Sequence, residues 1–301
     1  MRGPFAAHGL NGMAPRTTGL ILLIATAVGW GSNWPMLKLL LTELPPLQAR
    51  GVAGVTAGLA FALGALAFGV PLRVPQGLWP RLLLASLLNV TAWMGFATFG
   101  LVWLGAGEAA ILAYTVPVWT ALLAWPVLGE APSTRRLIAL LLSLAGVAIL
   151  FAGRGLDFGL AKLPGMALMT GAAVLFALGT VWGKRYPLGL PPVASVAWQV
   201  GLGCAPLLVL GLVFEPWRWG GLSPQGWGFV AWMTAVPLGL AYLTWFEAIK
   251  RVPATFATVA MLLAPMVGVA GAALALGEPF GLREAAALLL TLAGVLLASL
   301  G

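Results

Sequence analysis

Two stretches of the sequence, PVWTALLAWPVLGE at residues 117–130 and PMVGVAGAALALGE at residues 265–278, share one pattern. In each, a proline is followed at the same distance by Leu-Gly-Glu, and the second copy begins 148 residues after the first (265 minus 117). Further along, LAGV at 144–147 recurs at 292–295 with the same offset. Blocks that recur in one order at one spacing predict an internal duplication, in which each half of the chain is a structural repeat.

The composition excludes a soluble globular protein. Of the 301 residues, 61% are hydrophobic and 8% are charged, against about 25% charged in an ordinary soluble domain. The net charge of +8 therefore indicates basic cytoplasmic loops of a membrane protein rather than nucleic-acid binding. The single cysteine, Cys204, excludes an intramolecular disulfide, and the single histidine, His8, excludes a His-based metal site or a Ser-His-Asp triad. We expect no catalytic residue, no metal and no cofactor.

Apolar runs between charged residues and Pro/Gly breaks predict an all-α integral membrane protein, since a spanning helix needs about 20 mainly apolar residues. Ten runs fit, near residues 18–41, 45–70, 79–102, 107–128, 134–153, 163–184, 191–213, 225–247, 253–276 and 281–300. The predicted organisation is a cytoplasmic segment 1–17, a first repeat 18–153, a linker 154–162 and a second repeat 163–301.

Basic residues indicate how the predicted spans are oriented. When successive loops are assigned to alternate sides of the membrane, ten Lys and Arg residues fall on the side of the two termini and six on the other. Because basic residues are enriched in cytoplasmic loops, both termini are expected in the cytoplasm. Each half holds an odd number of spans, so the second half must be inverted relative to the first. An inverted repeat predicts a secondary transporter whose substrate binds near the membrane midplane, between the halves. We expect a multi-pass protein of a bacterial inner membrane.

Several of these motifs resemble a known family. The Trp30-Gly31-Ser32-Asn33 run, the two Pro-to-Leu-Gly-Glu blocks and the tandem pattern of spans resemble the drug/metabolite transporter superfamily, EamA type. The tryptophan-rich positions also resemble the bacterial amino-acid exporters of that superfamily, which are associated with aromatic amino acids. The resemblance implies a central cavity lined by spans 1 to 4 and 6 to 9, with spans 5 and 10 at the periphery.

The first span carries the densest set of candidate substrate contacts. Trp30, Asn33, Trp34 and Lys38 share one helical face, because residues three, four and eight apart lie nearly above one another. Asn33 suits a polar group of the substrate and the tryptophans suit its apolar part; a hydrogen bond between helices is the alternative for Asn33. Lys38, and Arg50 in the second span, suit a carboxylate at the cavity mouth, while snorkelling to the lipid headgroups explains them equally well.

Later spans place polar side chains beside aromatic rings at similar depth, a pattern that suits an amphipathic ligand with an ammonium group. For the tryptophans, helix packing is the alternative. The candidates are Asn89, Trp93, Tyr114, Trp198, Gln199, Tyr242 and Trp245. Glu130 and Glu278 recur where spans 4 and 9 end, and we interpret them as helix-end anchors or gate elements.

These patterns predict an exporter of amino acids, aromatic and other neutral or amphipathic ones, that works by alternating access. Few charges fall at mid-depth, so recognition is expected through tryptophans, amides and backbone groups, and the lack of a mid-membrane carboxylate favours facilitated diffusion. The alternatives are a proton-coupled transporter of another metabolite or drug (a nucleobase, a sugar or a cationic compound), an intramembrane enzyme and a channel. The expected partners are an amino-acid substrate and the lipid bilayer, with no nucleic acid; monomer and homodimer both remain open.

Overall fold

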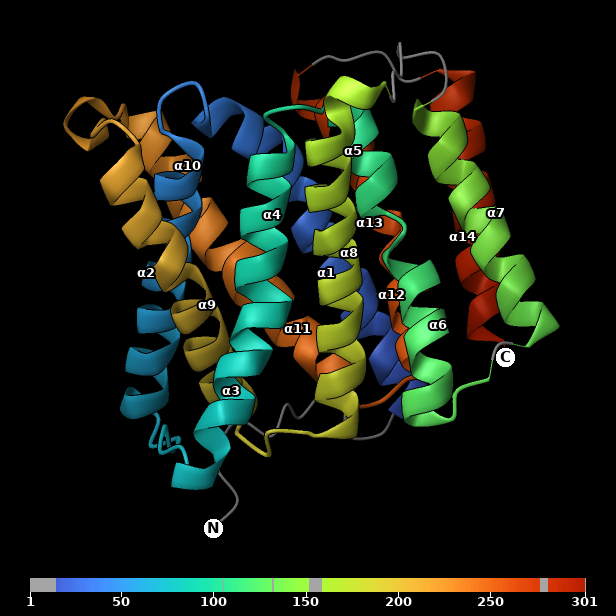
Figure 1. The fold of residues 1–301 in the computed structure, drawn as a ribbon, viewed down its shortest axis with the longest axis horizontal. Helices are drawn as coiled ribbons and strands as arrows, with labels where there is room; N and C mark the ends of the chain where they lie inside the picture. The colour runs from blue at the N-terminus through green and yellow to red at the C-terminus, as the bar shows by residue number, and fades with distance from the viewer. Residues whose placement is uncertain (1–14, 105, 132, 152–158, 277–280, 301) are drawn as a thin grey trace.

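The computed structural model describes residues 15–104, 106–131, 133–151, 159–276 and 281–300, and within them the chain is built from helices without strands (Figure 1). The first half contains α1 Pro15–Leu40, α2 Pro46–Ala67, α3 Trp79–Ser86, α4 Ala92–Gly100, α5 Ala106–Ala113, α6 Val116–Leu128 and α7 Thr134–Phe151. The second half contains α8 Leu163–Arg185, α9 Pro192–Phe214, α10 Pro224–Ala235, α11 Ala241–Ala248, α12 Ala254–Ala260, α13 Leu263–Leu276 and α14 Leu282–Ser299.

Helices occupy each of the predicted apolar runs. Among the described residues, eight helical segments are long and apolar enough to cross a membrane. Proline is the first residue of α2, α9 and α10. The N–H at this position has no partner within a helix, so proline, which lacks it, costs no hydrogen bond there. The short connections between helices run along the two ends of the bundle, as the alternating order of the spans requires (Figure 1).

Four of the predicted spans are not continuous α-helices. A π-helical turn at Leu87–Thr91 joins α3 to α4, and a second one at Val236–Leu240 joins α10 to α11. Between α5 and α6, and again between α12 and α13, the helix stops for two residues and restarts. Each restarted helix has a proline in its first turn, Pro117 in α6 and Pro265 in α13. Its ring and its missing N–H prevent the preceding helix from continuing regularly through this position. The predicted spans 107–128 and 253–276 are thus each interrupted by a short break near their middle.

Small residues bring α2 and α9 into direct contact at the centre of the bundle. A Cβ at Gly58 would lie 2.6 Å from the Cα of Gly201, and one at Gly54 would lie 2.1 Å from the Cys204 Sγ. Only glycine permits such an approach of two backbones. Gly54 and Gly58 thus allow α2 and α9 to pack closely.

The helices α7 and α14 form a separate pair at one edge of the bundle (Figure 1). A Cβ at Gly146 of α7 would lie 2.7 Å from the Ala287 carbonyl oxygen, and one at Gly294 of α14 would lie 2.6 Å from the Ala139 carbonyl oxygen. Each helix therefore presents its glycine to the backbone of the other. The expected peripheral position of spans 5 and 10 agrees with this placement.

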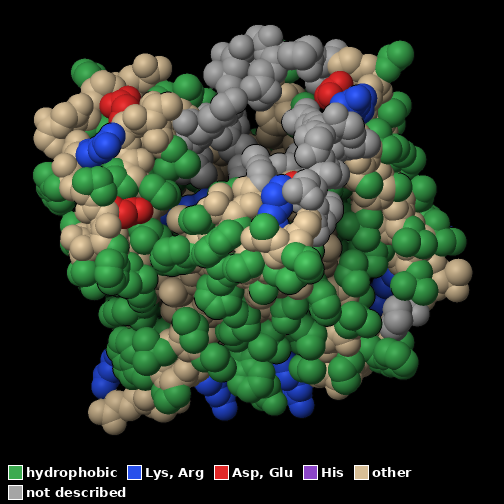
Figure 2. Space-filling model, turned by 45° about the horizontal axis from the view of Figure 1, so that its top comes forward, with side chains coloured by type: hydrophobic (Ala, Val, Ile, Leu, Met, Phe, Trp, Pro, Cys, Tyr) green, Lys and Arg blue, Asp and Glu red, His purple; other side chains and the backbone are tan. Residues whose placement is uncertain are grey.

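Charged side chains gather at the two ends of the molecule, and a hydrophobic belt lies between them on the face shown in Figure 2. The end that carries the α2–α3, α6–α7, α8–α9 and α11–α12 connections is the more basic one in the described residues. It holds Arg73, Arg81, Arg135, Arg136, Lys184, Arg185, Lys250 and Arg251. Such a belt between polar ends is what a lipid bilayer requires of a multi-pass protein.

Candidate functional site

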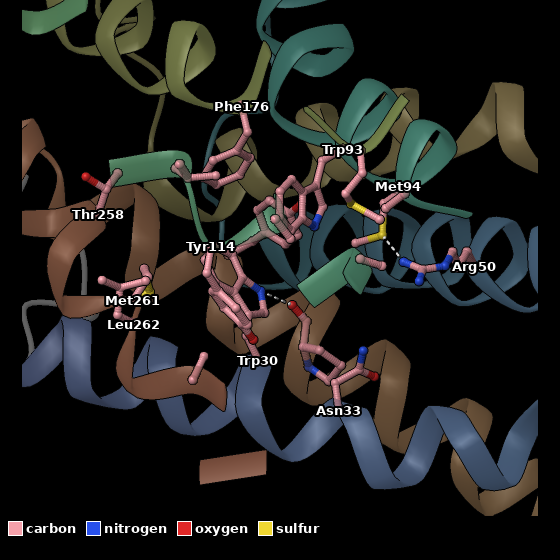
Figure 3. A pocket seen from close by; sticks show the side chains of 18 of the residues that line it. Trp30, Asn33, Arg50, Trp93, Met94, Tyr114, Phe176, Thr258, Met261 and Leu262 are labelled. Carbon is pink, nitrogen blue, oxygen red and sulfur yellow. Dashed lines mark hydrogen bonds between the residues drawn. The ribbon is translucent and has the colours of Figure 1, made fainter. Parts of the chain in front are cut away.

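A cavity of about 130 Å³ lies inside the bundle (Figure 3). This is on the order of ten times the space that one water molecule needs. Its described lining comes from α1, α2, α4, α5, α6, α8 and α10 to α13, and includes the breaks beside Tyr114 and Met261. Among the described residues α9 contributes none, because it packs along α2; the expectation that span 7 lines the cavity is therefore wrong.

Four aromatic side chains, Trp30, Trp93, Phe176 and Tyr242, form what we call the aromatic wall of this cavity. The Trp30 ring centroid lies 5.3 Å from that of Tyr242 and 6.1 Å from that of Phe176, and Trp93 lies 5.2 Å from Phe176. The Trp30 indole N–H donates a 3.0 Å hydrogen bond to the carbonyl of Pro237 in the second π-turn. Ring contacts and this bond hold the wall in place, so a ligand meets a preformed apolar surface.

Trp245 lies behind the aromatic wall. Its side chain is fully buried, with its ring centroid 5.5 Å from that of Trp30 and 5.7 Å from that of Phe176. It is absent from the described lining of the cavity. The structure thus gives Trp245 a supporting position, where the sequence predicted a substrate contact.

The polar side of the cavity is formed by Arg50 and Asn33. Arg50 is 9% exposed, and its Nη1 lies 2.8 Å from the sulfur of Met94. In the described part of the chain no carboxylate lies within ion-pair distance of the guanidinium. The Asn33 Oδ1 is buried and has no hydrogen-bond donor there. Snorkelling of Arg50 to lipid headgroups is therefore wrong, because the side chain turns into the protein.

The sequence predicted Arg50 as a carboxylate contact at the cavity mouth, but not its burial inside the protein. The parallel expectation of recognition through tryptophans, amides and backbone groups rested on the small number of charges at mid-depth. Arg50 shares a helical face with Gly54 and Gly58, which follow it at intervals of four residues. In the structure this face packs against α9, a neighbour that spacing within one helix does not reveal.

Asn89 and Gln199 pair with each other outside the cavity. The Asn89 amide donates to the Gln199 Oε1 at 3.2 Å, and the Tyr242 hydroxyl donates to the Asn89 carbonyl at 3.1 Å. The three residues come from the first π-turn, α9 and α11. These contacts pair the Asn89 amide nitrogen with Gln199 and fix the ring of Tyr242, which does line the cavity. The buried Asn89 Oδ1 has no hydrogen-bond donor among the described residues.

The remaining predicted contacts are divided between the cavity and other places. Tyr114 and Trp93 line the cavity. Trp198 does not: its indole donates to the Leu72 carbonyl at 2.9 Å and its ring lies 5.3 Å from that of Trp79, which agrees with helix packing. The side chains of Trp34 and Lys38 lie outside the described residues.

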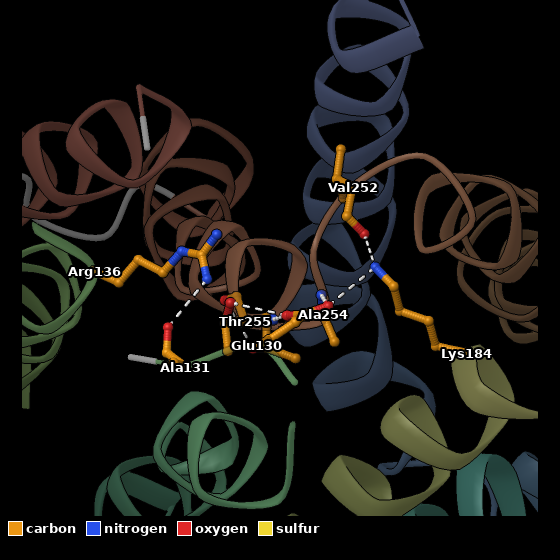
Figure 4. Close-up of polar contacts among 8 residues, drawn as sticks. Glu130, Ala131, Arg136, Lys184, Val252, Ala254 and Thr255 are labelled. Atoms are coloured by element: carbon orange, nitrogen blue, oxygen red, sulfur yellow. Dashed lines mark hydrogen bonds and ion pairs between the residues drawn. The ribbon is translucent and has the colours of Figure 1, made fainter. Parts of the chain in front are cut away.

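At the basic end of the molecule, Glu130 joins three helices (Figure 4). Its carboxylate accepts hydrogen bonds from the backbone N–H of Ala254 at 3.1 Å and from that of Thr255 at 3.4 Å, at the start of α12. Lys184 at the end of α8 lies 3.3 Å from the same carboxylate and donates to the carbonyl of Val252. Glu130 is thus a helix-end anchor, as predicted; Glu278 lies outside the described residues.

Comparisons with known proteins identify the family. The pattern of the EamA-like transporter family matches residues 17–152 and again residues 163–300. The uncharacterized transporter YvbV of Bacillus subtilis (strain 168) is 30% identical over 94% of this chain and 92% of its own length. The aromatic amino acid exporter YddG of Ancylobacter novellus is 26% identical over 78% of each chain. One solved crystal structure has the same fold, with a TM-score of 0.83 at 22% identity over 94% of this chain and 97% of the other.

Because two copies of one family pattern cover most of the sequence, and the helices and the apolar belt suit a membrane, the chain is a membrane transporter that belongs to the EamA-like transporter family of the drug/metabolite transporter superfamily.

Proposed function

We propose that this protein exports amino acids, aromatic and other neutral or amphipathic ones, across the inner membrane of a bacterium by alternating access and facilitated diffusion. The observation that carries the proposal is the chemistry of the cavity, in which an aromatic wall faces the buried Arg50. A ligand with an apolar part and an ionised headgroup matches both sides. The resemblance to an aromatic amino acid exporter agrees with it.

We further propose that the ten spans form two inverted five-helix repeats with both termini in the cytoplasm. Equivalent contacts in the two halves support this arrangement. Gly146 packs against Thr291, and Gly294 packs against Ser143; both partners are shifted by the same 148 residues (294 minus 146, 291 minus 143). Contacts that exchange in this way are typical of a two-fold axis between the halves. The π-turns and the helix breaks also occur at matching places.

The position of the cavity supports alternating access. Its lining includes Leu101 and Ala109 near the less basic end, whereas the ties of Glu130 to α12 and α8 join helices at the basic end. A site between two halves, with helices joined across one end, is what an alternating-access carrier needs. The helix breaks beside Tyr114 and Met261 lie at cavity level, where a change of backbone angle moves the lining directly.

The distribution of carboxylates favours facilitated diffusion over proton antiport. Acidic residues in the described chain lie near helix ends and none lines the cavity; they are Glu43, Glu108, Glu130, Glu215, Glu247 and Glu284. Glu108, the most buried of them, lies 2.7 Å from Lys162. A proton relay at the substrate site would need an ionisable acid or histidine there.

Counterflow in proteoliposomes tests the proposed function. Vesicles loaded with unlabelled tryptophan, leucine, uracil or glucose are given the labelled compound outside, with and without a pH gradient. We expect saturable exchange of the amino acids, faster for tryptophan, and no dependence on the gradient. Absence of saturable amino-acid exchange contradicts the proposal, and a rate that follows the pH gradient contradicts facilitated diffusion.

A substitution in the aromatic wall tests the apolar half of the site. Trp93→Ala removes a ring that lines the cavity, and an aromatic contact is worth about 1 kcal/mol beyond its buried area. We expect the KM for tryptophan exchange to rise about ten-fold and the KM for alanine to change little. Trp125→Ala, at a ring of the same half that is 60% exposed, is the control and should leave both values unchanged. Equal behaviour of the two variants would contradict the assignment.

A further inference from the structure

Arg50 is a buried cation with no carboxylate within ion-pair distance in the part of the chain that the structure describes. Its guanidinium has five N–H donors, and its one hydrogen-bond acceptor among the described residues is the Met94 sulfur, which is a weak acceptor. Removing a cation from water without a counterion is strongly unfavourable. The side chain lines the cavity, so a bound anion can reach it from there. A negatively charged group of a bound ligand would therefore supply the counterion that the guanidinium lacks among the described residues.

The shape of the site favours a carboxylate. A guanidinium binds a carboxylate through two parallel hydrogen bonds, a geometry that a lysine ammonium cannot offer. Arg50 is the only cation in the described lining, and the cavity is small and mainly apolar. A single carboxylate balances this one charge, whereas a phosphate dianion would bring a second negative charge without a partner.

Asn33 supplies the complementary half. Its Oδ1 is buried and meets no hydrogen-bond donor from the described residues, which is costly for a polar atom away from water. Asn33 comes from α1 and Arg50 from α2, and Figure 3 shows both to one side of the aromatic rings. A ligand ammonium at Asn33 would donate the missing hydrogen bond while its apolar part lies against the aromatic wall.

We propose that Arg50 and Asn33 form a two-point receptor for the headgroup of an α-amino acid, in which Arg50 binds the carboxylate and the Asn33 Oδ1 accepts from the ammonium. The assignment rests on the proposed function and narrows it, because it restricts the substrates to free amino acids. Decarboxylated amines and carboxyl esters lose the contact to Arg50. Deaminated acids keep that contact and lose the one to Asn33.

Ligand-induced thermal stabilisation of the purified protein tests the receptor without requiring transport. The probes are tryptophan, tryptamine, tryptophan methyl ester and indole-3-propionate. We expect tryptophan to stabilise the wild type at the lowest concentration, indole-3-propionate at about ten-fold more, and the two compounds without a carboxylate only at a concentration on the order of 100-fold higher. Asn33→Ala should remove the difference between tryptophan and indole-3-propionate.

Arg50→Gln should weaken tryptophan on the order of 100-fold, to the level of tryptamine. Without ligand the same variant should melt at a higher temperature than the wild type, since it removes an uncompensated buried charge. Arg50→Lys, which keeps the charge without the fork, should recover part of the tryptophan response, and the surface variant Arg218→Gln should match the wild type.

Equal responses to tryptophan and tryptamine, an unchanged tryptophan response in Arg50→Gln, or no response to any probe would each overturn the receptor. Arg50-dependent binding of tryptophan without amino-acid counterflow would overturn the proposed function and leave the receptor in place.

Discussion

Gly51→Ala is expected to destabilise the protein by about 1 to 3 kcal/mol, the usual range for overpacking, and Gly51→Leu to prevent assembly of the bundle. A Cβ at residue 51 would lie 2.4 Å from the Cα and 2.5 Å from the N of Leu208. Both atoms belong to the α9 backbone, which cannot rotate away as a side chain can. The helices must then separate along their central contact. Purified protein in detergent should melt about 5 °C lower for alanine and be aggregated for leucine, as measured by scanning fluorimetry and size-exclusion chromatography.

Gly64 provides a matched control in the same helix. No atom lies within 4 Å of the place where its Cβ would be. Alanine has a higher helix propensity than glycine, by about 1 kcal/mol. Gly64→Ala should therefore melt at the wild-type temperature or above it. Similar losses of stability for both alanine variants would show that helix propensity or lipid contact, rather than the approach of α2 to α9, controls these positions.

Much of the fold could be predicted from the sequence because membrane spans follow simple physical rules. Apolar runs of spanning length located the helices, since every backbone polar group in the bilayer must be bonded within its own helix. The duplicated Pro-to-Leu-Gly-Glu blocks indicated the repeat, and both copies match the family pattern. Pro117 begins the first duplicated block, but the break at Tyr114 and Thr115 could not be predicted, because the path of the chain there depends on helices that pack around it.

The lining of the cavity was predicted in part, for a related reason. Helical spacing correctly put Trp30 and Asn33 on one face, and both line the cavity. Spacing within one helix does not say which neighbour that face meets. Trp198 and Gln199 accordingly share a face that packs instead of lining the cavity, and Arg50 lies at the cavity although it is close to the end of its helix. Burial of a charge depends on several helices at once, so it became visible only in three dimensions.

Removing the Glu130 carboxylate is expected to open the basic end of the cavity. In Glu130→Gln the side chain keeps its size but loses its charge, so the contacts to Lys184 and to the α12 backbone weaken together. Hydrogen bonds to a charged group contribute about 1.5 to 3 kcal/mol each. The side chains of Glu130 and Lys184 are 14% and 24% exposed, and solvent weakens their attraction. The substitution should therefore destabilise the closed end by about 2 kcal/mol in total. If closure of this end limits access, its open population should rise roughly 30-fold.

The reactivity of a cysteine at a buried cavity position measures how often the basic end is open. Thr258 lines the cavity and is 1% exposed, so Thr258→Cys in a Cys204→Ala background gives a single thiol that is hidden while the end is closed. A membrane-impermeant thiol reagent applied from the basic end, in inverted vesicles, should modify it roughly 30-fold faster when Glu130→Gln is added.

Glu215→Gln supplies the control at the opposite end of the molecule. Its carboxylate accepts from the backbone N–H of Leu47 at 2.9 Å and of Gln48 at 2.8 Å, the same kind of helix-start contact. Because this contact lies at the far end, Glu215→Gln should leave labelling from the basic end unchanged. Faster labelling in both variants would mean that the bundle loosens as a whole. No acceleration in Glu130→Gln would mean that packing of the helices, and not this carboxylate, keeps the basic end closed.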